Sequence, residues 1–360
     1  MHRRQFLGAA AALAGMARLR RVEVSSLRFK YAICNEVFEK WDFAKSVRAM
    51  REAGFQGVEI APFTLGDDVD GLTPARRREM RDILKSEGVR FAGLHWLLIT
   101  PKWLHITTAD RTIREKSWAY FRKLIDLCGD LGENAIMVLG SPKQRGSQGN
   151  SREEATKHLK DGLASIADHA RSRGATIALE ALASKDTDVV NTVREAVRIV
   201  DELRHPAIQS MFDFHNTADE TEPFDRIVRT HFRAIRHVHM NEMDGRYPGT
   251  GTFDFRPVFR VLADLRYAGW VSLEVFDFKP GPWRSRAPRW TTSSSSKNRS
   301  PFDDQVHAPQ SAVHRARPVP GRCAARTMDT VVVNLPPEDV VWPVMRLTTR
   351  ILYRASRITG

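Results

Sequence analysis

Four residues of the types that bind divalent cations each stand at the C-terminal end of a short apolar run. These residues are Glu180, Asp213, His239 and Glu274, and they are 33, 26 and 35 positions apart along the chain. Each interval is about the length of one strand plus one helix. In a barrel of parallel strands all such positions point into one mouth. Three carboxylates and one imidazole would form an oxygen-rich divalent-cation site there.

A site of this composition favours Mn²⁺, with Mg²⁺, Co²⁺ or Zn²⁺ as alternatives. The cation could bind the carbonyl and neighbouring hydroxyl of a sugar, or of a small keto or hydroxy acid, and make the adjacent C–H bond more acidic. Glu180 and Glu274 are then the candidate catalytic residues, one removing a proton and the other returning it. This chemistry predicts metal-dependent proton transfer next to a polarised carbonyl.

The elements that must position these residues alternate between short apolar runs and longer amphipathic ones. Strict alternation, eight times over, predicts an α/β fold of the (β/α)8 TIM-barrel type over residues 28–282, with an open doubly wound sheet as the alternative. The eight expected strands are Phe29–Asn35, Gly57–Pro62, Val89–Leu98, Ala135–Gly140, Thr176–Ala181, Ile208–His215, Ile235–Asn241 and Trp270–Phe276.

Capping residues mark where the helices should begin and end. The expected starts are Asp42, Thr73-Pro74, the capping box Ser151–Glu154, Asn191, and Asp254 or Arg256-Pro257. Glycines that should end helices before the next strand are Gly54, Gly88, Gly132, Gly174 and Gly269.

Both ends of the chain differ from this body. Residues 1–21 contain Arg3-Arg4 before a short apolar run, which predicts a twin-arginine export signal and a periplasmic or other extracytoplasmic location, or a cytoplasmic one if the signal is not functional. The run is too short for a stable membrane span. Residues 283–360 are rich in Pro, Arg and Ser, which predicts a disordered or non-native basic tail in place of the eighth barrel helix.

Charge and cysteine content exclude two other classes of protein. The net charge of +13 belongs to the two ends, because residues 22–281 carry 38 basic and 38 acidic residues. A nucleic-acid partner is therefore not expected. Three scattered cysteines, Cys34, Cys128 and Cys323, suit buried free thiols better than a disulfide framework. The expected partner is a small molecule, and the chain is compatible with a homo-oligomer.

The motifs around the four ligands resemble those of the xylose isomerase-like sugar isomerase/epimerase barrels, and most of all the ketose 3-epimerases and hydroxypyruvate isomerases. The matching segments are 179–182, 212–216, 237–242, 246–251 and 272–274. The resemblance implies a metal held by Glu180, Asp213, His239 and Glu274, proton transfer by the two glutamates, and substrate contacts from His215 and Arg246. The family often has His three residues after the Asp ligand, where this sequence has Asn216.

Other residues could line the substrate pocket, although some of them could have a purely structural role instead. His95 and Glu59 end the third and second expected strands, so they could line the pocket. A core role suits His95 equally, and Glu59 could instead orient a ligand or pair with an arginine. Asp186 stands in for an acid that the family usually places six residues beyond the first Glu ligand. We assign His237 a structural role, on the expectation that only one of His237 and His239 faces the barrel interior.

Three other functions remain open. A dehydratase acting on inosose or dehydroshikimate would share all four ligands. A class II apurinic endonuclease would need additional histidines, and the segment Asp244–Arg246 lacks the one expected there. A non-catalytic exported sugar-binding protein would keep the pocket without needing the pair of glutamates. The loop of residues 140–149 could cradle a phosphate or be an ordinary surface loop.

Overall fold

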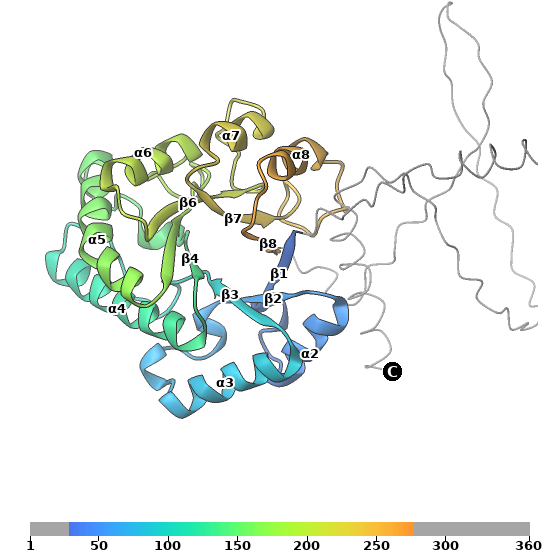
Figure 1. Cartoon of the computed structure of the whole chain (residues 1–360). Helices are drawn as coiled ribbons and strands as arrows, with labels where there is room; N and C mark the ends of the chain where they lie inside the picture. Colours follow the sequence, from blue (N-terminus) through green and yellow to red (C-terminus); the bar gives the residue numbers. More distant parts are fainter. Residues whose placement is uncertain (1–28, 277–360) are drawn as a thin grey trace, which may run out of the picture. The chain divides into compact units, whose positions relative to one another are not determined.

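The computed structural model describes residues 29–276, which form a closed barrel of eight parallel strands (Figure 1). The strands are β1 (Lys30–Cys34), β2 (Gly57–Ile60), β3 (Arg90–Leu94), β4 (Ala135–Leu139), β5 (Ala175–Leu179), β6 (Ile208–Asp213), β7 (Ile235–Met240) and β8 (Trp270–Leu273). Each pairs with its sequence neighbours, and β8 pairs in parallel with β1. This closure confirms the (β/α)8 barrel and excludes the open doubly wound sheet.

One helix follows each of the first seven strands and packs outside the barrel (Figure 1). They are α2 (Phe43–Ala53), α3 (Pro74–Glu87), α4 (Arg111–Leu131), α5 (Arg152–Ser172), α6 (Val193–Leu203), α7 (Phe224–His231) and α8 (Arg256–Asp264). Short 3-10 turns, η1 (Asn35–Phe38), η2 (Pro62–Thr64), η3 (Val69–Gly71) and η4 (Pro142–Gln144), follow β1, β2 and β4. The expected export signal, the expected tail and the expected lack of an eighth helix lie outside the described residues.

Most of the expected helix starts are confirmed by side-chain caps. Asp42, Thr73 and Ser151 each accept a hydrogen bond from the backbone N–H three residues later, and Glu154 completes the capping box at Ser151. Such caps satisfy N–H groups that have no partner within the helix. Helix α6 is capped by Thr192 rather than Asn191, because Asn191 turns its side chain amide to the carbonyls of Leu182 and Thr187.

The expected helix ends are confirmed in part. Gly54 and Gly88 end α2 and α3 in the left-handed conformation that glycine tolerates best. Gly132 also ends α4, although in an extended conformation. Gly174 is left-handed but follows Arg173, which is the cap of α5. Gly269 caps no helix, since α8 already ends at Asp264 and a short loop leads to β8.

The main hydrophobic core lies between the strands and the helices, and smaller apolar groups fill the barrel. Ile136, Val138, Ala178 and Met211 form one such group from β4, β5 and β6. Ala32, Ala92 and Trp270 form another, from β1, β3 and β8. Polar side chains are concentrated at the C-terminal ends of the strands, where a TIM barrel carries its functional site. Among residues 29–276, no helix is long and apolar enough to cross a membrane.

Candidate metal centre

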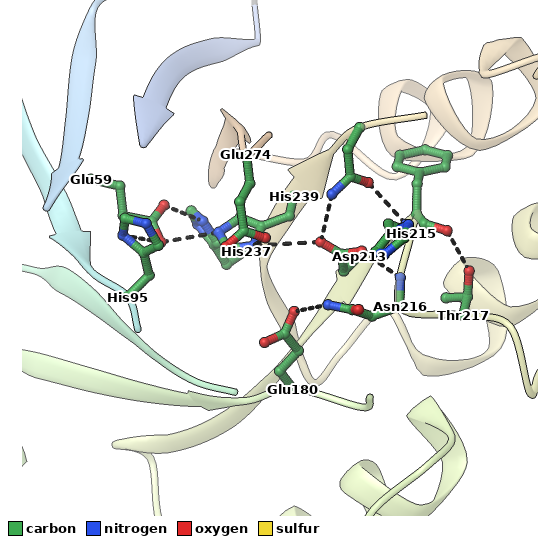
Figure 2. A network of polar contacts seen from close by, with 12 residues as sticks. Glu59, His95, Glu180, Asp213, His215, Asn216, Thr217, His237, His239 and Glu274 are labelled. Carbon is green, nitrogen blue, oxygen red and sulfur yellow. Dashed lines mark hydrogen bonds and ion pairs between the residues drawn. The ribbon is translucent and has the colours of Figure 1, made fainter. Parts of the chain in front are cut away.

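Glu180, Asp213, His239 and Glu274 meet at the C-terminal mouth of the barrel, as the sequence predicts (Figure 2). Asp213 ends β6 and His239 lies in β7, whereas Glu180 and Glu274 directly follow β5 and β8. One ligand atom of each lies within 4.8 Å of those of the other three. That spacing fits atoms in the first coordination shell of one ion, because such ligands lie about 2.0–2.2 Å from the metal.

The register of the strands explains why these side chains converge. Asp213 and His239 are direct cross-strand partners between β6 and β7, and His239 pairs in turn with Ser272 of β8. Leu179 of β5 pairs with Ser210 of β6, so Glu180 enters the same layer one residue beyond its strand. Residues at one height in a parallel barrel point into one layer, and here that layer is polar.

Unpaired buried atoms show that the group fits a cation. His239 Nδ1 and Glu274 Oε2 are 2.9 Å apart, yet both are buried without a hydrogen-bond partner. His239 Nδ1 also lies 3.6 Å from Asp213 Oδ2. Buried polar atoms without partners are costly, so atoms aimed at one point need a ligand between them. One imidazole nitrogen with three carboxylates suits a divalent cation such as Mn²⁺ or Mg²⁺.

Glu59 lies behind His239 and fixes the orientation of its ring. Its Oε1 is 3.0 Å from His239 Nε2, which leaves His239 Nδ1 directed at the other ligands. A carboxylate behind a ligating histidine sets the ring tautomer and raises its basicity as a ligand. Glu59 is fully buried, and its contact with His239 favours the orienting role over contact with a substrate. It pairs with histidines and not with an arginine.

His237 belongs to this network, contrary to the expectation that only His239 faces inward. Both rings are fully buried inside the barrel, and His237 Nε2 is 2.7 Å from Glu59 Oε2. The expectation is wrong because residues two apart on a strand point to the same face. The two flanking imidazoles hold the pKa of Glu59 well below its ordinary value, although burial alone would raise it.

His95 reaches the same region from the end of β3. Its Nε2 is 2.8 Å from Oε2 of Glu36, a residue of η1 that the sequence analysis did not single out. His95 Nδ1 lies 3.9 Å from Glu59 Oε1 and has no hydrogen-bond partner. His95 therefore belongs to the buried polar network, with one ring nitrogen bonded and the other without a partner, and its role toward a substrate stays a prediction. A carboxylate two residues beyond the end of β1 was the signal that could have revealed Glu36.

Neutral donors hold one oxygen of each catalytic candidate. The Asn216 side chain donates to Glu180 Oε1 at 2.9 Å, and the Trp96 indole donates to Glu274 Oε1 at 2.8 Å. Asn216 also donates its backbone N–H to Asp213 Oδ1 at 2.7 Å. Trp96 adopts a left-handed backbone with φ of 51°, a conformation that is strained for a bulky residue. From the sequence Trp96 could either wall the pocket or cover a helix, and its hydrogen bond to Glu274 was not foreseen.

Two features pack closely against Glu180, the backbone at Gly140 and the buried side chain of Arg145. A Cβ atom at Gly140 would lie 2.2 Å from Glu180 Oε2, so only glycine leaves room for that carboxylate. Arg145 is fully buried and donates to the carbonyls of Leu139 and Glu180 at 2.9 and 2.7 Å. Within the loop of residues 140–149 the guanidinium of Arg145 is thus taken up by backbone carbonyls, whereas Lys143, Gln148 and Gly149 are exposed. Burial lowers the pKa of Arg145 to about 10.

The remaining substrate candidates lie around the rim. The His215 ring packs against Phe276, with centroids 5.0 Å apart, and its Nδ1 is 2.9 Å from the carbonyl oxygen of Met243. Arg246 is half-buried and donates from Nε to Asp244 at 2.7 Å. Asp186 is exposed in a turn before α6. Their roles toward a substrate stay predictions. Asn216, and not His215, contacts the metal-binding carboxylates.

The two catalytic candidates experience opposite electrostatic environments. Burial, with Asp213 and Glu274 nearby, raises the pKa of Glu180 to about 8. Burial acts on Glu274 in the same direction, but the adjacent His239 outweighs it and lowers the pKa of that carboxyl. Two carboxyl groups whose pKa values differ in this way can take opposite roles, one giving up a proton and the other accepting it.

The sequence of residues 47–294 matches the family described as the xylose isomerase-like TIM barrel. The chain belongs to this family. The resemblance inferred from the ligand motifs is therefore confirmed, and so is the fold. Within this family, one similar protein is a probable ketose 3-epimerase of Synechocystis, which is 24% identical over 282 residues, covering 76% of this chain and 93% of that protein.

Two further proteins show the same likeness. A ketose 3-epimerase of Arthrobacter globiformis is 26% identical over 235 residues, covering 64% of this chain and 76% of that protein. A D-psicose 3-epimerase structure from Clostridium cellulolyticum, with D-tagatose, has a TM-score of 0.60 at 19% identity, covering 69% of this chain and 85% of that one. At this identity the structural match supports the fold.

Proposed function

We propose that this protein is a divalent-metal-dependent sugar epimerase that inverts the carbon next to the carbonyl of a ketose. The observation that carries the proposal is the group formed by Glu180, Asp213, His239 and Glu274, whose ligand atoms lie within 4.8 Å of one another. Relatives named ketose 3-epimerase and L-ribulose 3-epimerase support a ketose substrate and inversion at C3.

The same four residues would hold the cation, for which Mn²⁺ is our first candidate. When bound, the cation supplies Lewis-acid polarisation of the substrate carbonyl. His239 Nδ1 and Glu274 Oε2 have no hydrogen-bond partner, so their lone pairs are available to coordinate the cation. Glu59 keeps His239 in the tautomer that leaves Nδ1 free to coordinate.

Glu180 and Glu274 would move the proton. Figure 2 shows their carboxylates approaching one space from β5 and β8, which suits removal of a proton on one face of the substrate and its return on the other. The N–H groups of Asn216 and Trp96 fix one oxygen of each without neutralising its charge. Each carboxylate therefore keeps both its orientation and its ability to accept a proton.

Aromatic side chains would shield this chemistry from water. Trp96 lies 6.0 Å from Phe276 and 6.4 Å from Phe63 between ring centroids, and the Trp96 indole donates to Glu274. An aromatic wall suits the C–H face of a sugar and lowers the local dielectric. His215 and Arg246 would contact substrate oxygens at the rim.

The test is proton exchange with solvent. The full chain loaded with Mn²⁺ is incubated in deuterium oxide with D-fructose, D-psicose, D-tagatose and L-ribulose, and the sugars are followed by NMR. We expect deuterium at C3 together with the C3 epimer. Glu274→Gln should abolish both while the chain stays folded, whereas Glu133→Gln, an exposed carboxylate, serves as the matched control and should leave both unchanged.

Three outcomes would contradict the proposal. Loss of water from an inosose or dehydroshikimate, without exchange into ketoses, would indicate the dehydratase. Cleavage of DNA at abasic sites would indicate the endonuclease. Binding of a sugar with no deuterium in any of those tested would indicate the exported binding protein. Export through the twin-arginine pathway remains a separate proposal, tested by replacing Arg3 and Arg4 with Lys and following the location of the protein.

A further inference from the structure

A pocket at the N-terminal end of the barrel, opposite the metal centre, is surrounded by basic side chains. Its volume is about 590 Å³. Lys30 begins β1, Trp270 begins β8, and Arg236 is the second residue of β7. Arg233 and Arg266, in the connections that lead into β7 and β8, line it as well. Four cationic side chains therefore surround the pocket, and none of the described residues that line it is acidic.

The indole of Trp270 closes the barrel at this pocket. Two of its ring atoms would lie 2.8 Å from a Cβ at Gly57, so the ring reaches past β1 to β2. Lys30 Nζ lies 5.2 Å from the centroid of this ring, and Arg90 Cζ lies 4.6 Å from it. Lys30 is the cross-strand partner of Trp270, and Arg90 is that of Gly57. The strands thus hold two cationic groups on one ring, to which each is attracted.

Few of these cations have a carboxylate to neutralise them. Arg233 pairs with Asp201 at 2.9 Å, and Asp201 does not line the pocket. Arg236 donates to two backbone carbonyls. Within residues 29–276, Lys30 and Arg266 form no ion pair. Like charges that share a pocket repel one another, so an anion bound among them would relieve that repulsion.

The repulsion affects Lys30 directly. Partial burial, and then the positive charge of Arg90, lower the pKa of the Lys30 ammonium group. The rest of the chain is poorly suited to supply the missing negative charge. Residues 1–28 carry six basic residues and one acidic residue, and residues 277–360 carry fourteen basic and six acidic ones. The counter-charge is therefore expected from a separate molecule.

We propose that this pocket binds a phosphate group, either as inorganic phosphate or as the phosphate ester of a small molecule such as a sugar. A guanidinium can donate two parallel hydrogen bonds to phosphate oxygens, and a phosphate dianion offsets more positive charge than a single carboxylate does. Asn134 and Thr176 also line the pocket and offer neutral hydrogen-bonding groups. Pockets for small molecules usually measure roughly 300–1,000 Å³, and this one lies in that range. The inference does not require the proposed epimerase reaction.

The first experiment measures binding. The full chain is titrated by calorimetry with inorganic phosphate and with fructose 6-phosphate, in a buffer without phosphate. We expect binding that weakens as the salt concentration rises, because salt screens the charges. Lys30→Gln and Arg236→Gln should each weaken it about 10-fold or more, since each removes a charge-assisted hydrogen bond. Arg198→Gln, which removes an exposed arginine of α6, is the matched control and should bind like the wild type.

The second experiment locates the bound ligand. The chain is treated briefly with acetic anhydride, and the acetylation of each lysine is followed by mass spectrometry. Bound phosphate should slow the modification of Lys30 and leave that of Lys116, an exposed lysine of α4, unchanged. The ligand that protects Lys30 at the lower concentration is the better candidate for the natural one. Protection by either ligand supports the proposal.

Wild-type affinity in both Lys30→Gln and Arg236→Gln would overturn the inference. Phosphate binding that leaves Lys30 unprotected would overturn it too, because the anion would then lie elsewhere on the chain. A DNA duplex that protects Lys30 at lower concentrations than either phosphate would show a nucleic-acid surface instead. Lys30→Arg keeps the charge and should keep the binding, and circular dichroism of each variant separates lost charge from lost folding. None of these measurements depends on turnover, so each outcome leaves the proposed function standing.

Discussion

Gly140→Ala is the sharpest test of how closely the fold places Glu180. The added Cβ would lie 2.2 Å from Glu180 Oε2 and 3.4 Å from Glu180 Cδ, whereas ordinary contacts begin at 3.4 Å. The carboxylate oxygen must therefore retreat by about 1.2 Å, and it cannot simply swing aside because Asn216 holds its other oxygen. A misplacement of about 1 Å at a reacting group costs roughly 100-fold in rate, or about 2.7 kcal/mol of transition-state stabilisation.

The assay compares Mn²⁺ affinity by calorimetry and the rate of deuterium exchange into a ketose for Gly140→Ala and the wild type. Gly71→Ala is the matched control, because no atom lies within 4 Å of a Cβ at that position. We expect weaker metal binding and about 100-fold slower exchange for Gly140→Ala alone. Wild-type affinity together with a wild-type exchange rate would refute the argument that Glu180 is held in place by this close approach.

Other parts of the site give further expectations. Chelation with EDTA should abolish activity, and Mn²⁺ should restore it best among divalent cations; an enzyme unaffected by chelation would rule out the metal mechanism. Glu59→Gln should weaken metal binding by about 10- to 100-fold, measured by competition with a chromogenic chelator, because His239 loses the carboxylate that orients it. Trp96→Phe keeps an aromatic ring but removes the N–H that holds Glu274, so kcat should fall by about 10-fold or more with metal content unchanged; an unchanged kcat would show that this hydrogen bond does not position the base. Burial raises the pKa of Glu180 to about 8 in the folded metal-free chain, above its ordinary value in the unfolded chain. The folded state therefore binds this proton more tightly, and the stability that this contributes at low pH is lost as the pH rises from about 4.5 through 8. Thermal unfolding of the metal-free chain should therefore show a declining Tm over this range, and Glu180→Gln should flatten the decline.

The barrel and its four ligands could be predicted because each signal is local and repeated. Every ligand directly ends an apolar run, and the parallel register then carries Asp213 and His239 to the same height as Glu180 and Glu274. Helix caps such as Asp42 and Ser151 could also be read from single residues.

The contacts that were missed join residues distant in sequence. Trp96 donates to a residue 178 positions away, and Glu36 meets His95 across 59 positions. Nothing near Arg145 in the sequence indicates that its guanidinium donates to the carbonyl of Leu139 in β4 and to that of Glu180 after β5. The misjudged role of His237 had a different origin, since it reversed the rule that side chains alternate along a strand.

The pairing of β8 with β1 would give a bound cation a mechanical role. These strands are the last and the first of the barrel, and their hydrogen bonds are the seam at which the sheet could open. Glu274 directly follows β8 at this seam, whereas Glu180, Asp213 and His239 belong to or follow β5, β6 and β7. An ion bound by all four side chains would tie the last strand of the barrel to three other strands and so hold the seam closed. Loading with metal should therefore slow amide hydrogen exchange in β1 and β8 more than in β4, which lies far from the seam.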